Sequence, residues 1–331
     1  MKISDFILQN ISAHPSDIVK LSMKEFGITR PAVHKHLKKL IEEKKVVAEG
    51  GTKSRVYHLS ETVPICFYVK VKKGLNESKV WEEHLEALTH KLPKNVYSIC
   101  YYGFTEMVNN VIDHSGAKSF FVSFQIDKNK VRFLIGDNGI GIFEKIKKTL
   151  HLENYREALL HLTKGKFTTD PSKHTGEGIF FTSRAFDEFH LTANEIKYSR
   201  FDENDWLIHI EKETQGTDVE MLIDKDSPKV LKKIFDKYAP AKDDYSFNKT
   251  EVLVALGLNP DEVYISRSQA KRILLGLDKF KHIILDFKRV QTVGQGFVDE
   301  VFRVFKNEHP QIKITSINAN EDVDFMIRRG K

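Results

Sequence analysis

Three polar residues spaced by four, Glu106, Asn110 and His114, are the first sign of chemistry in the sequence. The stretch that carries them, 96–114, has helical patterning, so their side chains share one face of a helix. On such a face a carboxylate suits proton abstraction, an amide oxygen suits metal binding, and an imidazole provides a polar neighbour. Polar triplets at this spacing also occur on helices whose polar face is only solvated, so these residues alone do not define a site.

An acidic residue and two glycines, Asp137, Gly139 and Gly141, come next. Strands are predicted at 119–127 and 130–135, and Asp137 follows the second of them. An acidic side chain at a strand end, beside glycines that let another molecule approach the backbone, suits recognition of a purine amino group. The same pattern is common in turns, so it also needs support from elsewhere in the chain.

That support comes from a second glycine segment, in which Gly176 and Gly178 precede a helix predicted at 179–186. Free N–H groups at the start of a helix can hold phosphate, and glycine leaves room for it. Gly216-Thr217 then leads into a last strand, predicted at 218–223. None of these segments is decisive alone, but together and in this order they indicate a nucleotide site.

The ordered motifs resemble those of the GHKL ATPase superfamily, which includes histidine kinases, the gyrase B subunit and the anti-sigma-factor serine kinases. The resemblance covers roughly 80–224. Within it, the segment 167–171 (Phe-Thr-Thr-Asp-Pro) is most similar to the lid over the nucleotide in the anti-sigma-factor kinases. The resemblance implies that the middle of the chain binds ATP with Mg²⁺.

The resemblance also implies a role for each motif residue. Asn110 would bind the Mg²⁺ that bridges the phosphates, and Asp137 would accept a hydrogen bond from the adenine amino group, assisted by Thr217. Glu106 would be the general base that deprotonates a water or a hydroxyl group. The alternative for Glu106 is a carboxylate that only orients a lysine or a water. The other implied contacts are Gly139 and Gly141 at the base, Gly176 and Gly178 at the phosphates, and Thr168 with Lys173 or His174 from the lid.

Most of the positive charge lies in the first sixty residues, which carry eleven basic and six acidic side chains and so hold five of the six net charges. Three helical patterns and a hairpin around Gly50-Gly51 follow one another there, and their order resembles bacterial winged-helix regulators. A DNA contact is expected for this domain, although a winged helix that contacts only protein is the alternative. The residues expected at DNA are Thr29, Arg30, His34, Lys35 and Lys38 on the third helix, and Lys53 and Arg55 at the hairpin.

Strands and helices alternate between 250 and 329, which predicts a small α/β layer. Three segments of it (265–272, 283–287 and 294–297) resemble the STAS-like domain of uncharacterised function, the DUF4325 type, which often accompanies a GHKL ATPase. STAS domains of anti-anti-sigma factors carry a phosphorylatable serine near the position of Gln295, and the nearest hydroxyl here is Thr292. The polar cluster at 266–272 is either a helix cap with solvated neighbours or an interaction site.

The resulting prediction is an α+β multidomain protein. It comprises a winged helix at 1–61, a Bergerat-type α/β sandwich ATPase domain at 79–225 and a small STAS-like α/β domain at 246–331. Residues 62–78 are expected to be a connector. Two cysteines without a CxxC pair, and the absence of any apolar run that could span a bilayer, favour a cytoplasmic location without a membrane partner.

Three functions are compatible with this organisation. The leading hypothesis is an ATP-binding transcriptional regulator, in which Mg·ATP changes DNA affinity and the STAS-like domain senses the lid or a protein partner. The alternative is an anti-sigma-type serine/threonine kinase acting on a STAS-like partner or on its own Thr292. A nucleotide-binding scaffold with negligible turnover is the third. Each is compatible with a homodimer.

Overall fold

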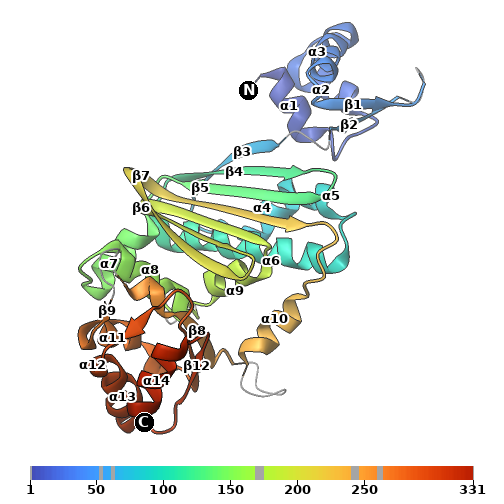
Figure 1. The fold of residues 1–331 in the computed structure, drawn as a ribbon. Coiled ribbons are helices and arrows are strands. Elements are labelled where there is room, and N and C mark those ends of the chain that lie inside the picture. Colours follow the sequence, from blue (N-terminus) through green and yellow to red (C-terminus); the bar gives the residue numbers. More distant parts are fainter. Residues whose placement is uncertain are drawn as a thin grey trace.

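The computed structural model describes most of the chain, namely residues 2–51, 55–60, 64–167, 175–239, 246–258 and 264–330. These residues form a mixed α/β protein with several separate sheets. Figure 1 shows three units in chain order, with the N-terminal unit (blue) and the C-terminal unit (orange to red) at opposite ends of the molecule. Within the described residues, no helix combines the length and the apolar composition that a membrane crossing requires.

The N-terminal unit consists of three helices followed by an antiparallel strand pair. Apolar residues of the helices meet Val46 and Tyr57 of the strands in a core that belongs to this unit alone. Gly27 ends the second helix, and Thr29 immediately precedes the third, as predicted. The elements are α1 (Ile3–Asn10), α2 (Ile18–Phe26), α3 (Arg30–Glu42), β1 (Val46–Glu49) and β2 (Val56–Leu59).

The middle unit is built on a five-stranded sheet in the order β3-β4-β5-β7-β6, with every pair antiparallel. The helices share one large apolar core with this sheet, and fully buried Trp81 and Phe133 lie in it. The strands are β3 (Ile65–Lys70), β4 (Ser119–Ile126), β5 (Lys130–Asp137), β6 (Glu188–Phe201) and β7 (Asn204–Asp224). The helices are α4 (Glu77–His84), α5 (Glu86–Thr89), α6 (Lys94–Asn110), a π-helical turn η1 (Val111–Ser115), α7 (Ile142–Leu150), α8 (Tyr155–Lys164), α9 (Gly178–Ala185) and α10 (Leu231–Tyr238).

Two sequence predictions for this unit are wrong. The segment expected to be a connector contains β3, which pairs with β4 along its whole length, so the sheet begins at Ile65. The last strand is also far longer than the predicted 218–223, because β7 starts at Asn204 and forms a long hairpin with β6. The outer half of that hairpin extends beyond the rest of the sheet. Its tip contacts the C-terminal unit.

The C-terminal unit has the predicted alternation of strands and helices, with a three-stranded parallel sheet in the order β12-β10-β8 and a separate pair of β9 and β11. Ser266 begins α11 in a capping box with Gln269, which favours the helix-cap reading of the 266–272 cluster. The strands are β8 (Lys249–Leu253), β9 (Tyr264–Ile265), β10 (His282–Asp286), β11 (Thr292–Val293) and β12 (Lys313–Ile317). The helices are η2 (Val254–Gly257), α11 (Arg267–Leu274), η3 (Leu277–Lys279), α12 (Gln295–Val298), η4 (Asp299–Val304), α13 (Phe305–Glu308) and α14 (Glu321–Gly330).

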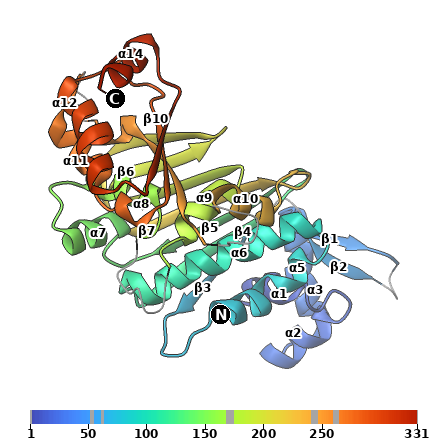
Figure 2. The same cartoon turned by 90° about the horizontal axis from the view of Figure 1, so that it is seen from below.

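The middle and C-terminal units are not separated by solvent. Buried residues of α8, α9 and α10 belong to the same apolar core as the C-terminal unit, among them Leu160, Phe180 and Tyr238. Figures 1 and 2 both show α8 and α9 next to this unit. The C-terminal unit therefore rests directly on helices of the middle unit.

Candidate nucleotide site

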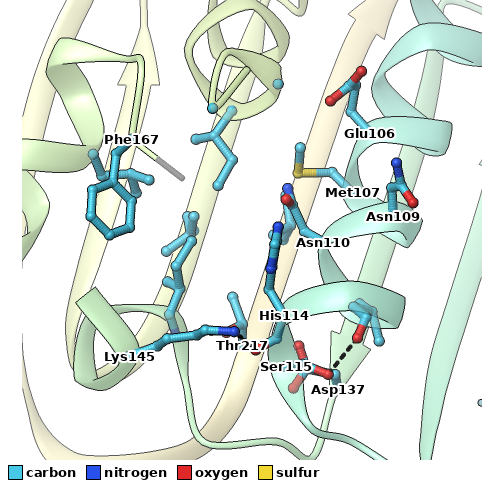
Figure 3. A pocket seen from close by; sticks show the side chains of 18 of the residues that line it. Glu106, Met107, Asn109, Asn110, His114, Ser115, Asp137, Lys145, Phe167 and Thr217 are labelled. Atoms are coloured by element: carbon cyan, nitrogen blue, oxygen red, sulfur yellow. Dashed lines mark hydrogen bonds between the residues drawn. The ribbon is translucent and has the colours of Figure 1, made fainter. Parts of the chain in front are cut away.

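One cavity of about 300 Å³ lies in the middle unit, between α6, the end of β5 and the start of α9 (Figure 3). Its volume is at the lower end of the range typical of small-molecule sites. Residues from six separate segments of the chain meet in its wall, and four of these segments carry the predicted motifs. Seven of the predicted nucleotide contacts line it: Glu106, Asn110, Asp137, Gly141, Gly176, Gly178 and Thr217.

Helix α6 presents the predicted polar face to this cavity. Glu106, Asn110 and His114 all line it, even though the helix widens to a π turn after Asn110. The side-chain nitrogen of Asn110 is buried, and no described residue accepts a hydrogen bond from it. A buried donor without a partner is costly, so this nitrogen suits a ligand atom that accepts a hydrogen bond, and the oxygen of the same amide stays available to a cation.

The residues present fit a nucleotide-bound Mg²⁺ rather than a metal held by protein alone. Within the described ranges, no three His, Cys, Asp or Glu side chains cluster in a way that could hold a metal ion. Mg²⁺ commonly keeps several waters and takes few protein ligands when phosphates supply the rest. The Asn110 amide in the cavity wall could provide one such oxygen.

Asp137 is fixed as an acceptor at the other end of the cavity. It ends β5, and its carboxylate accepts the N–H of Gly139 at 2.7 Å and the main-chain N–H of Thr217. Burial raises the pKa of Asp137, and those two hydrogen bonds act in the opposite direction. The Thr217 hydroxyl in turn accepts the N–H of Ile142 at 3.0 Å, so it braces the glycine segment beside Asp137.

Two of the predicted glycines are required by close packing around the site. Gly141 has φ +80°, and a Cβ there would lie 2.6 Å from the side-chain oxygen of Asn194. Asn194 is itself buried and accepts the N–H of Glu144 at 3.1 Å. Gly139 lies behind the cavity wall, where a Cβ would overlap the main-chain oxygen of Ser115.

Glu106 lies directly against the start of α9, since a Cβ at Gly178 would overlap its Oε2 atom. Burial, together with the nearby carboxylates of Glu177 and Glu77, raises the pKa of Glu106 to about 7. A carboxyl group with a pKa near 7 exchanges its proton readily at neutral pH, as a general base must. Burial also raises the pKa of Glu177.

Two charged residues of the cavity wall, Lys145 and Glu177, were missed by the sequence interpretation. The Lys145 ammonium donates to the main-chain oxygen of His114 at 2.7 Å, and burial lowers its pKa. It lies four residues after Gly141, on α7, a helix that the sequence analysis did not predict. Glu177 lies between two predicted phosphate-binding glycines, which was itself a usable signal.

The predicted lid contacts Thr168, Lys173 and His174 lie outside the described residues, and so does Lys53 of the hairpin. Phe167, at the start of the predicted lid, lines the cavity.

The predicted DNA-contacting residues are mostly solvent-exposed. Arg30, Lys35 and Lys38 are exposed on α3, Thr29 is exposed just before α3, and Arg55 is exposed just before β2. His34 differs, because it is half-buried and its Nδ1 lies 3.3 Å from the Tyr57 hydroxyl, which ties α3 to β2.

Comparison with known families gives one match. A family model described as a STAS-like domain of unknown function (DUF4325) matches residues 269–324, which span α11 to α14. The C-terminal unit therefore contains a STAS-like domain, as the sequence predicted. No match was found among curated proteins.

Proposed function

We propose that this chain is a transcriptional regulator in which a GHKL-type middle domain binds Mg·ATP and thereby modulates DNA binding by an N-terminal winged helix. One observation carries the proposal: the four motif segments converge on one cavity with chemically different ends. A fixed carboxylate lies at one end, and an unpartnered amide and a glycine-flanked helix start lie at the other.

Each end of the cavity suits a different part of ATP. Asp137 would accept a hydrogen bond from the adenine amino group, and its bonds to Gly139 and Thr217 keep it oriented for that contact. At the other end, the N–H groups at the start of α9 would donate to phosphate oxygens, with the helix dipole adding to the attraction. Asn110 would bind Mg²⁺, which neutralises phosphate charge when it is present.

The N-terminal unit supports the DNA half of the proposal through its surface charge. Its sixty residues hold five of the six net positive charges of the chain, and Arg30, Lys35 and Lys38 are exposed on α3. A basic exposed helix that follows a glycine-ended helix is the arrangement expected of a recognition helix in the major groove.

An electrophoretic mobility-shift experiment tests the coupling of the two halves. Fragments selected by the protein from random DNA would be titrated with and without a saturating Mg·ATP analogue. We expect a shift in DNA affinity for the wild type and none for Asp137→Asn. Equal wild-type affinity in both conditions would remove the coupling, because a ligand changes a second affinity only through differential binding.

A serine/threonine kinase is the second candidate, and the pKa of Glu106 near 7 favours it. Such a carboxylate could accept the proton of a hydroxyl group as it attacks the terminal phosphate. Incubation with γ-labelled ATP followed by mass spectrometry would reveal a labelled Ser or Thr, with Thr292→Ala testing the internal acceptor. Release of free phosphate without labelled protein would exclude this candidate.

A further inference from the structure

Two lysines at the end of α8 and just after it, Lys164 and Lys166, are hydrogen-bonded to the C-terminal domain, directly before a cavity-lining residue. Thr250 donates to the main-chain oxygen of Lys164 at 2.7 Å. The Lys166 ammonium donates to the side chain of Asn248 at 3.0 Å and to the main-chain oxygen of Lys279 at 3.1 Å. Phe167 follows at once and lines the cavity. We call residues 164–167 the first wall segment.

Lys164 provides the deepest of these contacts. Its side chain is 2% exposed, and its ammonium donates to the carbonyl oxygens of Arg272 at 3.1 Å and Leu275 at 3.0 Å. These carbonyls are at the C-terminal end of α11, where the helix dipole favours a positive charge. Glu157, about two turns earlier on α8, pairs with Arg272 at 3.4 Å and reinforces the same junction. Burial lowers the pKa of Lys164 to about 7.

Gly165 shows how closely the two parts fit. It has φ +77°, and a Cβ there would lie 2.5 Å from the ring of Phe247. The Lys166 ammonium lies 5.8 Å from the centre of the same ring and 4.9 Å from that of Phe280. The junction therefore combines polar bonds with aromatic packing, and neither partner can move far without breaking both.

The opposite wall of the cavity is held by the same domain. Residues 175–181, the second wall segment, include cavity-lining Gly176 and Gly178 and then Phe180 and Phe181 of α9. The rings of Phe180 and Phe181 lie 4.5 Å and 4.9 Å from that of Phe247. One aromatic side chain of the C-terminal domain thus contacts both wall segments.

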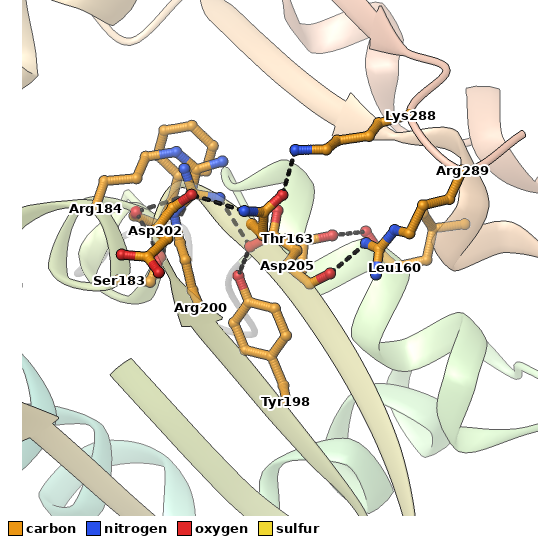
Figure 4. A network of polar contacts seen from close by, with 12 residues as sticks. Leu160, Thr163, Ser183, Arg184, Tyr198, Arg200, Asp202, Asp205, Lys288 and Arg289 are labelled. Carbon is orange, nitrogen blue, oxygen red and sulfur yellow. Dashed lines mark hydrogen bonds and ion pairs between the residues drawn. The ribbon is translucent and has the colours of Figure 1, made fainter. Parts of the chain in front are cut away.

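A second junction keeps the C-terminal domain in this position (Figure 4). Lys288 and Arg289, which follow β10, donate to Asn204 and to the main-chain oxygen of Asp205 at the tip of the β6–β7 hairpin. The Arg289 guanidinium also lies over the Trp206 ring, 4.7 Å from its centre. Behind them, Tyr198 and Arg200 fix the Asp205 carboxylate at 2.6 Å and 2.8 Å.

We infer that the docked STAS-like domain holds both walls of the cavity and slows nucleotide release. Lys164 and Lys166 are the positioning residues for the first wall segment, and Phe247 holds the second. The inference rests on the proposed nucleotide site. Where docking raises the equilibrium affinity for nucleotide, thermodynamic linkage requires nucleotide to strengthen docking of the C-terminal domain by the same factor. A partner that displaces the C-terminal domain from α8 and α9 would therefore speed nucleotide release.

Two measurements on the full-length chain test this regulation. The first is the dissociation rate of a fluorescent Mg·ATP analogue from the wild type, Lys164→Met and Lys166→Met. The matched control is Lys128→Met, which replaces an exposed lysine in the β4–β5 turn. We expect release to be at least threefold faster from both junction variants and unchanged from the control. The second is hydrogen exchange of segments 246–258 and 271–280, which Mg·ATP analogue should slow in the wild type but not in Lys164→Met.

The outcomes separate the two proposals. A wild type that binds no nucleotide overturns the proposed function and this inference with it. A wild type that binds nucleotide, with unchanged release from both variants or no protection of the two C-terminal segments, overturns this inference alone. If the Lys164→Met protein does not fold, Lys166→Met and the wild-type exchange experiment decide. A loss of thermal stability without loss of the nucleotide-dependent protection would mean that the lysines are only structural, which also contradicts the inference.

Discussion

Asp137 is the side chain whose replacement tests the nucleotide site most directly. We expect Asp137→Asn to weaken binding of adenine nucleotides about tenfold or more, because a charged acceptor is replaced by an amide that can misorient. Titration calorimetry with Mg·ATP would measure this loss. Asp226→Asn, at an exposed position after β7, is the matched control and should bind like the wild type. If the two variants bind Mg·ATP with equal affinity, the adenine ring is not bound by Asp137.

Glu106 predicts a specific pH dependence of stability. Its pKa is raised to about 7 from the ordinary 4.5, so the folded protein binds more protons than the unfolded chain between these values. The contribution of Glu106 to the free energy of unfolding therefore falls as the pH rises from about 4.5 through 7. Urea unfolding of the wild type and Glu106→Gln at pH 5 and pH 8 should show a smaller decrease for the variant. If the free energy of unfolding falls by the same amount in both proteins between pH 5 and pH 8, Glu106 has an ordinary pKa.

The same residue makes a kinetic prediction for any turnover. A base must be ionised, so the rate should rise with pH through about 7. Glu106→Gln should lower turnover by at least about a hundredfold, as loss of general base catalysis does, while retaining nucleotide binding. A variant with wild-type turnover would favour the role of Glu106 as an orienting carboxylate. A wild type that binds ATP but does not turn it over would favour the scaffold hypothesis.

At the scale of elements, the two walls of the cavity meet at Gly176. It has φ +72°, and a Cβ there would overlap the main chain of Phe167. We expect Gly176→Ala to destabilise the fold by about 1–3 kcal/mol and to weaken nucleotide binding, since neither backbone can yield without moving a wall. Gly51→Ala, where a Cβ meets open space, is the control for thermal denaturation. A Gly176→Ala protein with unchanged stability and affinity would show that the walls separate easily.

The elements also show what the sequence could and could not predict. The Glu106 helix, the strand ending at Asp137 and the glycine-led α9 were predictable because each has a strong local pattern. Strand β3 was missed, although Ile65, Phe67 and Val69 alternate, because a lysine-rich segment follows and the partner strand lies over fifty residues away. The outer part of β7 was missed too, although Trp206, Ile208 and Ile210 alternate, because charged and polar residues follow them and most side chains between 204 and 215 are solvated.

Lys164 marks the limit of sequence interpretation in the site region. A Lys-Gly-Lys run before a predicted lid is typical of a solvated loop, yet Lys164 is buried against α11. Only the docking of a domain about a hundred residues further along the chain explains its burial. The cavity itself was predictable from motifs, whereas its support by the C-terminal domain was not.

At the scale of the whole molecule, the charge distribution predicts how DNA affinity depends on salt. Each phosphate contact that is removed should reduce the slope of log K against log salt by about 0.9. Lys35→Ala and Lys38→Ala should therefore weaken binding to all sequences and flatten this slope, measured by fluorescence anisotropy between 50 and 200 mM salt. Lys128→Ala, in the middle domain, should leave both values unchanged. An unaltered slope in the α3 variants would favour the protein-contact alternative for the N-terminal unit.

The position of β3 at the edge of the sheet sets the reach of the N-terminal unit. Five residues separate Leu59 at the end of β2 from Ile65 at the start of β3. Such a tether spans at most about 20 Å, whereas successive half-sites on one face of DNA are about 34 Å apart. In a dimer, the distance between the two N-terminal units would therefore be governed by where the two β3 strands lie. If these units bind DNA as proposed, operator spacing would report the geometry of the two five-stranded sheets.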